Sequence, residues 1–157
     1  MFLNEDALKY VCRLSEEKGR AITEKYPEHI VISSDTIVIH NDKILGKPID
    51  KEDAFQMLRA LSGDSHEVIT AFSIQSNKMN IDLTEYEVTE VHFRKLSDDD
   101  IIDYIAGGSP MDKAGAYGIQ DVEAYLVDSI NGSYHNVIGF PVSHFALKWN
   151  TIFNRLL

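Results

Sequence analysis

The sequence has one cysteine and no long apolar run, and these two shortages exclude several classes of protein. Cys12 alone forms no internal disulfide and supplies no paired thiolates for a structural zinc site. No segment approaches the roughly 18 uninterrupted apolar residues of a transmembrane helix. The start at Met1 lacks the basic and apolar regions of a signal peptide. We therefore expect a cytoplasmic protein that does not bind a membrane.

Basic residues are also scarce. Lys and Arg number 15 against 25 Asp and Glu, which gives a formal net charge of −10, so we expect no general attraction to nucleic acid. An anionic ligand would need a local group of lysines or arginines. With 157 residues, of which 44% are hydrophobic and 25% charged, the chain is long enough to bury a core. We predict a single domain over residues 1–157.

Hydrophobic periodicity predicts a mixture of helices and strands. A helix capped by Asn4 should run to about Tyr26, and the β-branched run 30–39 is typical of a central strand covered on both faces. Asp50 should cap a helix that ends before Gly63. The remaining predicted elements are strands at 66–74, 86–93 and 123–130, a helix from Ser97 through Tyr104, and a closing helix at 142–156. This mixture favours an α/β fold with a mixed sheet.

Asp35 is the only charged residue between Ile30 and Ile39. An isolated carboxylate in an apolar interior costs several kcal/mol unless it is paired or binds a metal. Two interpretations fit. The strand surfaces at its centre and Asp35 only accepts backbone hydrogen bonds, or Asp35 is a general base or metal ligand at the mouth of a cleft.

Three lysines are candidate phosphate ligands. Lys18 lies on the helix before that strand, Lys47 lies between a glycine and a proline, and Lys113 lies in a glycine-rich loop at 107–118. Each lysine taken alone is more often solvated, so only their convergence on one pocket would make them ligands. Loop residues 109–120 offer backbone amides, an aromatic ring and the carboxamide of Gln120, which suit a nucleotide's phosphates and base.

No generic sequence motif identifies the function of these candidate residues. The loop matches neither the P-loop pattern nor G-x-G-x-x-G, the six histidines lack a tight metal spacing, and no G-x-S-x-G surrounds a serine.

Longer strings in the chain carry a family resemblance. They are Ser34-Asp35-Thr36, Ile44-Leu45-Gly46-Lys47-Pro48, Leu61-Ser62-Gly63, His66-Glu67-Val68-Ile69-Thr70, Asp112-Lys113-Ala114-Gly115-Ala116-Tyr117-Gly118-Ile119-Gln120 and Gly132-Ser133-Tyr134-His135-Asn136-Val137-Ile138-Gly139-Phe140-Pro141. Together they resemble the Maf family of nucleoside triphosphate pyrophosphatases, from about Asp6 to the C-terminus.

The resemblance implies a two-lobed mixed α/β fold with a nucleotide cleft between the lobes. It implies a divalent cation, Mg²⁺ or Mn²⁺, and cleavage between the α- and β-phosphates. Asp35 would be the proton acceptor and a metal ligand, and Lys18 and Lys47 would contact the triphosphate, with Lys113 a further candidate. Thr36 and Gln120 would tune the choice of base. The form of the 112–120 string resembles the branch that acts on dTTP and UTP rather than on 7-methyl-GTP.

The chain departs from the family at its start. It begins downstream of the family's opening strand and Ser-x-Ser-Pro-Arg-Arg loop, whose arginines belong to the triphosphate site. Two consequences are expected, a weakened activity and an unpaired sheet edge that favours a homodimer. The alternative function is a weakly active or non-catalytic homologue that binds nucleotide or a division partner. A house-cleaning enzyme for deaminated purines is a third reading.

Overall fold

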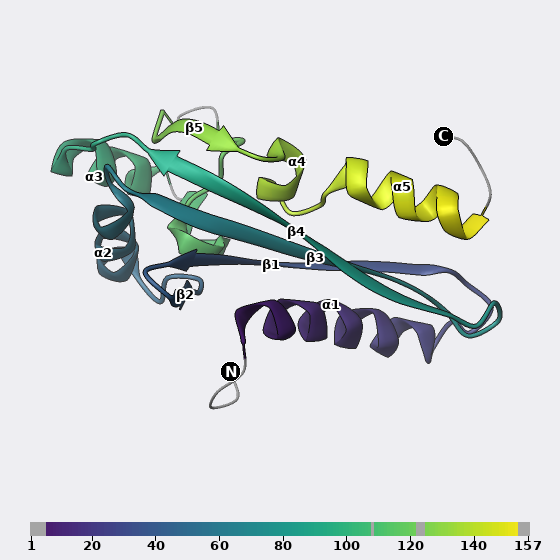
Figure 1. Cartoon of the computed structure of the whole chain (residues 1–157). Coiled ribbons are helices and arrows are strands. Elements are labelled where there is room, and N and C mark those ends of the chain that lie inside the picture. The colour runs from purple at the N-terminus through teal and green to yellow at the C-terminus, as the bar shows by residue number, and fades with distance from the viewer. Residues whose placement is uncertain (1–5, 108, 122–124, 154–157) are drawn as a thin grey trace. The chain divides into compact units, whose positions relative to one another are not determined.

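The computed structural model describes residues 6–107, 109–121 and 125–153 (Figure 1). Helices and strands mix along the whole chain. In chain order the elements are α1 (Ala7–Thr23), β1 (Val31–His40), β2 (Lys43–Leu45), α2 (Lys51–Leu61), β3 (Ser65–Ser76), β4 (Ile81–Phe93), α3 (Asp98–Ala106), the short 3₁₀ helices η1 (Ser109–Asp112) and η2 (Ala114–Ala116), β5 (Val127–Asn131), α4 (Tyr134–Val137) and α5 (Val142–Phe153). None of the helices in these ranges is long and apolar enough to cross a membrane.

The five strands form one sheet in the order β2-β1-β3-β4-β5. The sheet is antiparallel: β1 pairs with β2 through Val38 and Leu45, and β4 pairs with β5 through Val91 and Ile130. The predicted α/β class is therefore confirmed, with antiparallel neighbours where the sequence pattern favoured a mixed sheet.

β1 lies between β2 and β3 and is therefore an interior strand, as predicted for residues 30–39, but the middle strand of the sheet is β3. β1 lies next to the short edge strand β2, and Ile32 of β1 is 45% exposed. β3 is buried almost throughout, although it contains Thr70, Ser73 and Gln75. The polar residues in β3 made its central position hard to predict from the sequence. Their hydrogen bonds within the fold allow them to be buried where only apolar residues were expected.

Contacts divide the chain into two compact units, and the long strands β1, β3 and β4 each contribute to both. Unit 1 comprises Met1–Thr36, Ile69–Glu87 and His135–Leu157, and unit 2 comprises Ile37–Val68 and Val88–Tyr134.

Unit 1 has a helix on each face of its strands (Figure 1). α1 begins at Asp6, whose carboxylate accepts hydrogen bonds from the backbone N–H groups of Leu8 and Lys9. α5 packs Phe145 against the fully buried ring of Phe72 on β3, with ring centroids 5.7 Å apart. The two helices thus enclose this part of the sheet.

Unit 2 holds its core between α2, α3 and the ends of the strands. Asp50 caps α2 as predicted, and Leu58 and Leu61 of α2 are fully buried. Ser97 caps α3 in a capping box with Asp100, which is why this short acidic-fronted helix begins there.

Several predicted boundaries shift. The predicted cap Asn4 lies outside the described residues, and α1 ends at Thr23 rather than near Tyr26, although the next residues continue as hydrogen-bonded turns. β5 begins at Val127, four residues after the predicted start at 123. The described part of the closing helix ends at Phe153.

Candidate functional site

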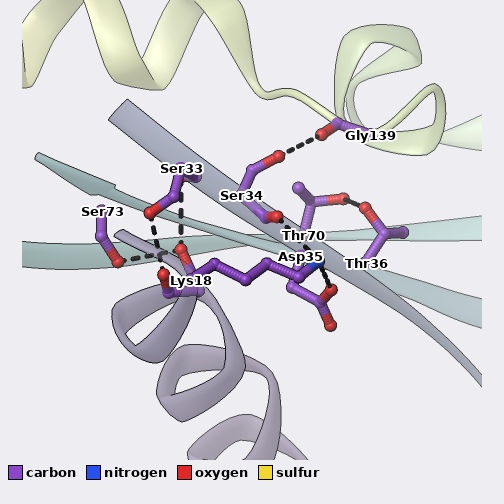
Figure 2. A network of polar contacts seen from close by, with 9 residues as sticks. Lys18, Ser33, Ser34, Asp35, Thr36, Thr70, Ser73 and Gly139 are labelled. Atoms are coloured by element: carbon purple, nitrogen blue, oxygen red, sulfur yellow. Dashed lines mark hydrogen bonds and ion pairs between the residues drawn. The ribbon is translucent and has the colours of Figure 1, made fainter. Parts of the chain in front are cut away.

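The polar centre of β1 presents its side chains alternately to two faces, as an extended strand must (Figure 2). Ser33 and Asp35 contact α1, whereas Ser34 and Thr36 contact Gly139 and Thr70. All of these contacts lie within unit 1. Asp35 and Thr36, adjacent in sequence, therefore serve opposite faces of the strand.

The face toward α1 is fixed by serine hydroxyls. Ser33 Oγ donates to the backbone oxygen of Ser15 at 2.8 Å, and Ser15 Oγ lies 2.8 Å from Ser73 Oγ on β3. α1 approaches β1 closely at Gly19, where an added Cβ would overlap the side chains of Gln75 and Ser33. This close approach sets the position of Lys18, one turn beyond Ser15 on the same side of the helix.

Lys18 and Asp35 form an ion pair on this face. Lys18 Nζ contacts Asp35 Oδ1 and also donates to the backbone oxygen of Ser34 at 3.3 Å. The Asp35 side chain is 15% exposed and that of Lys18 is 56% exposed. The pairing answers the question that the sequence raised about Asp35: its carboxylate is compensated by a cation, and part of it still faces solvent.

The other face of β1 carries a set of partly buried hydroxyl hydrogen bonds. Ser34 Oγ donates to the backbone oxygen of Gly139 at 3.0 Å, and Thr36 Oγ1 lies 2.9 Å from Thr70 Oγ1. Gly139 has a φ of 104°, a conformation that favours glycine. Its turn, which follows α4, is thereby held against β1.

In unit 2, two predicted lysines lie on loops that are joined by a backbone hydrogen bond. The N–H of Gly115 donates to the oxygen of Gly46 at 3.0 Å, which links the segment before Lys47 to the segment after Lys113. Lys113 Nζ lies 3.1 Å from a carboxylate oxygen of Asp112. The hydrogen bond from Lys113, with further help from its charge and that of Lys47, lowers the pKa of Asp112.

The loop's far end is held by a tyrosine from α3. Tyr104 Oη donates to Asp121 Oδ2 at 2.7 Å and accepts from the N–H of Gly118 at 3.1 Å. Lys113 Nζ lies 3.9 Å from Asp121. Gln120, directly before Asp121, is exposed in the turn, so its carboxamide faces solvent on a loop whose base is anchored.

A buried aromatic group anchors the middle of the same loop. Tyr117 Oη lies 2.6 Å from His66 Nε2, and both rings contact Phe93 edge-on. Burial, followed by the charge of His40, lowers the pKa of His66 to about 4, so its ring is neutral at pH 7. Burial raises the pKa of Tyr117. The pair is an uncharged support of the loop.

The six predicted residues thus fall into two sets. Unit 1 brings Lys18 and Asp35 into contact and places Thr36 on the opposite face of the strand, while unit 2 carries Lys47, Lys113 and Gln120 on linked loops.

Among the described residues, unit 1 has a pocket of about 260 Å³ and unit 2 one of about 430 Å³, and none of the six residues lines either of these. The first is bounded by Arg20, Thr23, Gln75, Ser76, Asn77, Asn80, Ile81 and Asp82, and the second by Lys51, Glu52, Phe55, Ile102, Ile105 and Ala106.

Sequence reasoning gave no role to several residues that position this site. Thr70 and Asn136 are fully buried polar residues beside Thr36, and Tyr104 and Asp121 hold the loop. Thr70 and Asn136 do occur in the strings that carry the family resemblance. The available signal was a polar residue inside an apolar run, which only a hydrogen-bond partner explains.

By its fold, this is a mixed α/β protein whose polar strand centre pairs a carboxylate with a lysine. A family described as Maf-like protein matches residues 3–148. Over 137 residues the chain is 47% identical to a protein of Clostridium botulinum (strain Kyoto / Type A2) named dTTP/UTP pyrophosphatase, covering 85% of this chain and 71% of that protein. A protein of the same name from Koribacter versatilis (strain Ellin345) is 45% identical over 139 residues, covering 88% and 71%. This chain belongs to the Maf family.

The side chains that could act as ligands show whether the divalent cation implied by the family fits this site. In the described ranges, no three or more His, Cys, Asp or Glu side chains group together in a way that could hold a metal ion. Asp35 is the predicted ligand, and Lys18 contacts its carboxylate. Mg²⁺ is commonly bound through one or two carboxylates together with substrate phosphates and water. The residues present therefore fit a cation that is shared with a nucleotide.

Proposed function

We propose that this chain is a nucleoside triphosphate pyrophosphatase that hydrolyses dTTP and UTP to the monophosphate and pyrophosphate. The observation that carries the proposal is the contact between Lys18 and Asp35 on β1, in a chain whose relatives are named dTTP/UTP pyrophosphatase. A partly exposed carboxylate beside an exposed ammonium group suits both proton transfer and phosphate binding.

In the proposed reaction, Asp35 orients a water molecule and accepts its proton as the water oxygen bonds to the α-phosphorus. The bond between the α-phosphorus and the α–β bridging oxygen breaks, and pyrophosphate leaves with the electron pair on that oxygen. Lys18 and Lys47 hold phosphate oxygens and offset the negative charge that develops on the leaving group. A divalent cation bound by Asp35 and the phosphates would supply further charge neutralisation.

Base choice is assigned to Thr36 and Gln120 in this proposal. The carboxamide of Gln120 both donates and accepts, so it could pair with the carbonyl and N–H edge of a pyrimidine. Lys113 is proposed as a further phosphate ligand, since its ammonium group lies on the same loop.

The test is a substrate panel with UTP, dTTP, CTP, ATP, GTP and 7-methyl-GTP, each with Mg²⁺ or Mn²⁺, and with EDTA as the control. We expect equimolar pyrophosphate and monophosphate, UTP and dTTP first in kcat/KM, and loss of activity in EDTA. GTP or 7-methyl-GTP in first place would contradict the assignment of substrate. Nucleotide binding without pyrophosphate release would instead establish the non-catalytic alternative.

A cytoplasmic location is part of the proposal, and its support is the single cysteine. Fractionation of cells that express the tagged full chain tests this location, and recovery in the membrane or secreted fraction would contradict it.

A further inference from the structure

An open apolar groove lies on the surface of unit 2 between α2 and α3. It is the pocket of about 430 Å³, and most of its lining is apolar, from Phe55, Ile102, Ile105 and Ala106. Ile102 is 53% exposed, so part of this apolar surface is in contact with solvent. Exposed apolar surface that forms a continuous hollow is typical of an interaction site.

The face of α3 that borders the groove also carries two carboxylates. Residues 99, 102, 103 and 106 are spaced by three and four along the helix and therefore share one side of it. Ile102 and Ala106 of this set line the groove, and Asp99 and Asp103 are exposed beside them. Among the described residues, neither aspartate side chain has a hydrogen-bond or ion-pair partner.

These two carboxylates are unfavourable for the helix itself. Like charges four residues apart repel each other, and Asp103 lies in the last turn, where the helix dipole disfavours an anion. The neighbouring acidic residues do have partners, since Asp98 pairs with Arg59 and Asp100 completes the capping box. Asp99 and Asp103 therefore offer uncompensated negative charge to a cation from outside the two helices.

The charge around the groove determines what kind of partner fits it. Together α2 and α3 carry six carboxylates and two basic side chains, and one of these bases, Arg59, is paired with Asp98. The other base, Lys51, is next to Glu52 in the sequence. A complementary partner therefore has apolar side chains for the groove and Lys or Arg beside them.

The openness of the groove favours a protein segment over a small ligand. A small-molecule site buries most of its ligand, whereas Ile102 leaves this groove open at the surface. A groove between two helices receives a third helix through apolar side chains spaced by three and four residues. A second copy of this chain fits poorly, because two copies that each have a net charge of −10 repel each other.

We propose that the groove between α2 and α3 is a docking site for an amphipathic helix of another protein. Apolar side chains of that helix enter the groove, and its lysines or arginines pair with Asp99 and Asp103. None of the six candidate residues of the nucleotide site lines the groove. The proposal therefore does not depend on the proposed catalytic activity.

Two synthetic helical peptides are the probes. They share one stripe of leucines at three- and four-residue spacing and differ only in the flanking residues, which are lysines in one peptide and glutamates in the other. Calorimetry with the full chain should show the lysine peptide binding at least about tenfold more tightly than the glutamate peptide. Amide chemical shifts should change in α2 and α3. Equal affinities, or shift changes confined to other elements, would overturn the proposal.

Ile102→Gln tests the apolar part of the site. Because Ile102 is more than half exposed, this change should leave the fold intact. The affinity for the lysine peptide should fall about tenfold. Leu147→Gln is the matched control, since Leu147 is a 68% exposed apolar residue of α5 in unit 1. Equal losses of affinity in the two variants would overturn the proposal.

The double variant Asp99→Asn with Asp103→Asn tests the charged part. It should bind the lysine peptide about tenfold more weakly and reduce the preference over the glutamate peptide. Asp42→Asn with Asp128→Asn is the control, because it removes the same charge from two other exposed positions of unit 2. An equal loss in the control would show a general attraction between opposite charges, and the docking site would be refuted.

Two measurements test the other occupants. A parent that sediments as a dimer and becomes monomeric through Ile102→Gln would make the groove an interface between copies and would overturn the proposal. Octylamine that shifts the amide signals of α2 and α3, in a parent that binds neither peptide, would show a small-ligand pocket and would also overturn it. A monomeric parent that binds the lysine peptide through Ile102 and the two aspartates would establish the docking site.

Discussion

The two units hold their predicted site residues by different means. In unit 1, Asp35 and Thr36 lie on a strand whose side chains are fixed on both faces by hydroxyl bonds and by the Lys18 ion pair. In unit 2, Lys113 and Gln120 lie on a loop whose middle is anchored by the buried ring of Tyr117 and whose end is held through Asp121. A strand holds a reactive side chain in a closely defined position. Exposed side chains on an anchored loop can be substituted with a smaller effect on activity.

This comparison predicts that the largest effect on activity comes from the strand. Asp35→Asn should lower kcat for UTP by about 10²–10⁴, since the amide cannot accept the proton of the water. The unfolding temperature should change little, because the amide keeps the shape of the side chain. Steady-state kinetics and thermal melts measure the two quantities.

Asp42→Asn is the control for that variant. Asp42 is an exposed turn residue with a φ of 60°, a conformation that asparagine tolerates. Activity of Asp35→Asn within a few-fold of Asp42→Asn, at saturating Mg²⁺, would show that the strand carboxylate is not the base.

The second prediction concerns the buried support of the loop in unit 2. Because the pKa of His66 is lowered from 6.5 to about 4, the folded protein keeps this ring neutral between these pH values while the unfolded chain binds a proton. The unfolded state then holds more protons, so the free energy of unfolding falls as pH falls through this window. By pH 4.5 the loss should be about 2–3 kcal/mol.

Urea unfolding of the parent and of His66→Gln, in steps from pH 8 to pH 4.5, checks this dependence. The glutamine variant should lose the part of the slope that His66 contributes. The hydrogen bond from His40 lowers the pKa of Asp64, which both proteins share, so the difference between their slopes measures His66. Equal slopes in both proteins would contradict the prediction.

The third prediction concerns the backbone of the loop. Gly115 has a φ of 69°, and an added Cβ would lie 3.1 Å from a methyl group of Val38 in the same unit. Gly115→Ala should therefore lower the free energy of unfolding by about 1–2 kcal/mol. Gly46→Ala is the matched control, because an added Cβ there meets nothing within 4 Å. Thermal and urea unfolding compare the two variants, and equal stabilities would disprove strain at Gly115.

The smallest expected effect comes from the loop's outer anchor. Tyr104→Phe removes the hydroxyl that bonds Asp121 and Gly118, which should raise KM for UTP by about fivefold while kcat changes less. Tyr125→Phe serves as the control, since Tyr125 is 53% exposed in the same unit. A fall in kcat as large as that of Asp35→Asn would contradict the difference between strand and loop. The loop would then position the reacting groups as closely as the strand does.

Local sequence features predicted most of the secondary structure, because caps and periodicity act over a few residues. Asp50 and Ser97 begin their helices as expected, and the strand at 66–74 is found within β3. Errors arose where a distant partner decides the outcome. β3 proved central despite Thr70 and Ser73, whose hydroxyl bonds to residues far away in the chain no local pattern reveals.

The same distinction holds for the candidate site. The sequence by itself determined the family and the candidate residues, because strings such as 112–120 are specific and Asp35 stands alone in an apolar run. Only the tertiary structure decided that Lys18 pairs with Asp35 and that Thr36 serves the opposite face, where its hydroxyl bonds that of Thr70. The physical reason is that charge pairing and hydrogen bonding depend on which atoms meet in space, and here those atoms belong to residues 17 and 34 positions apart.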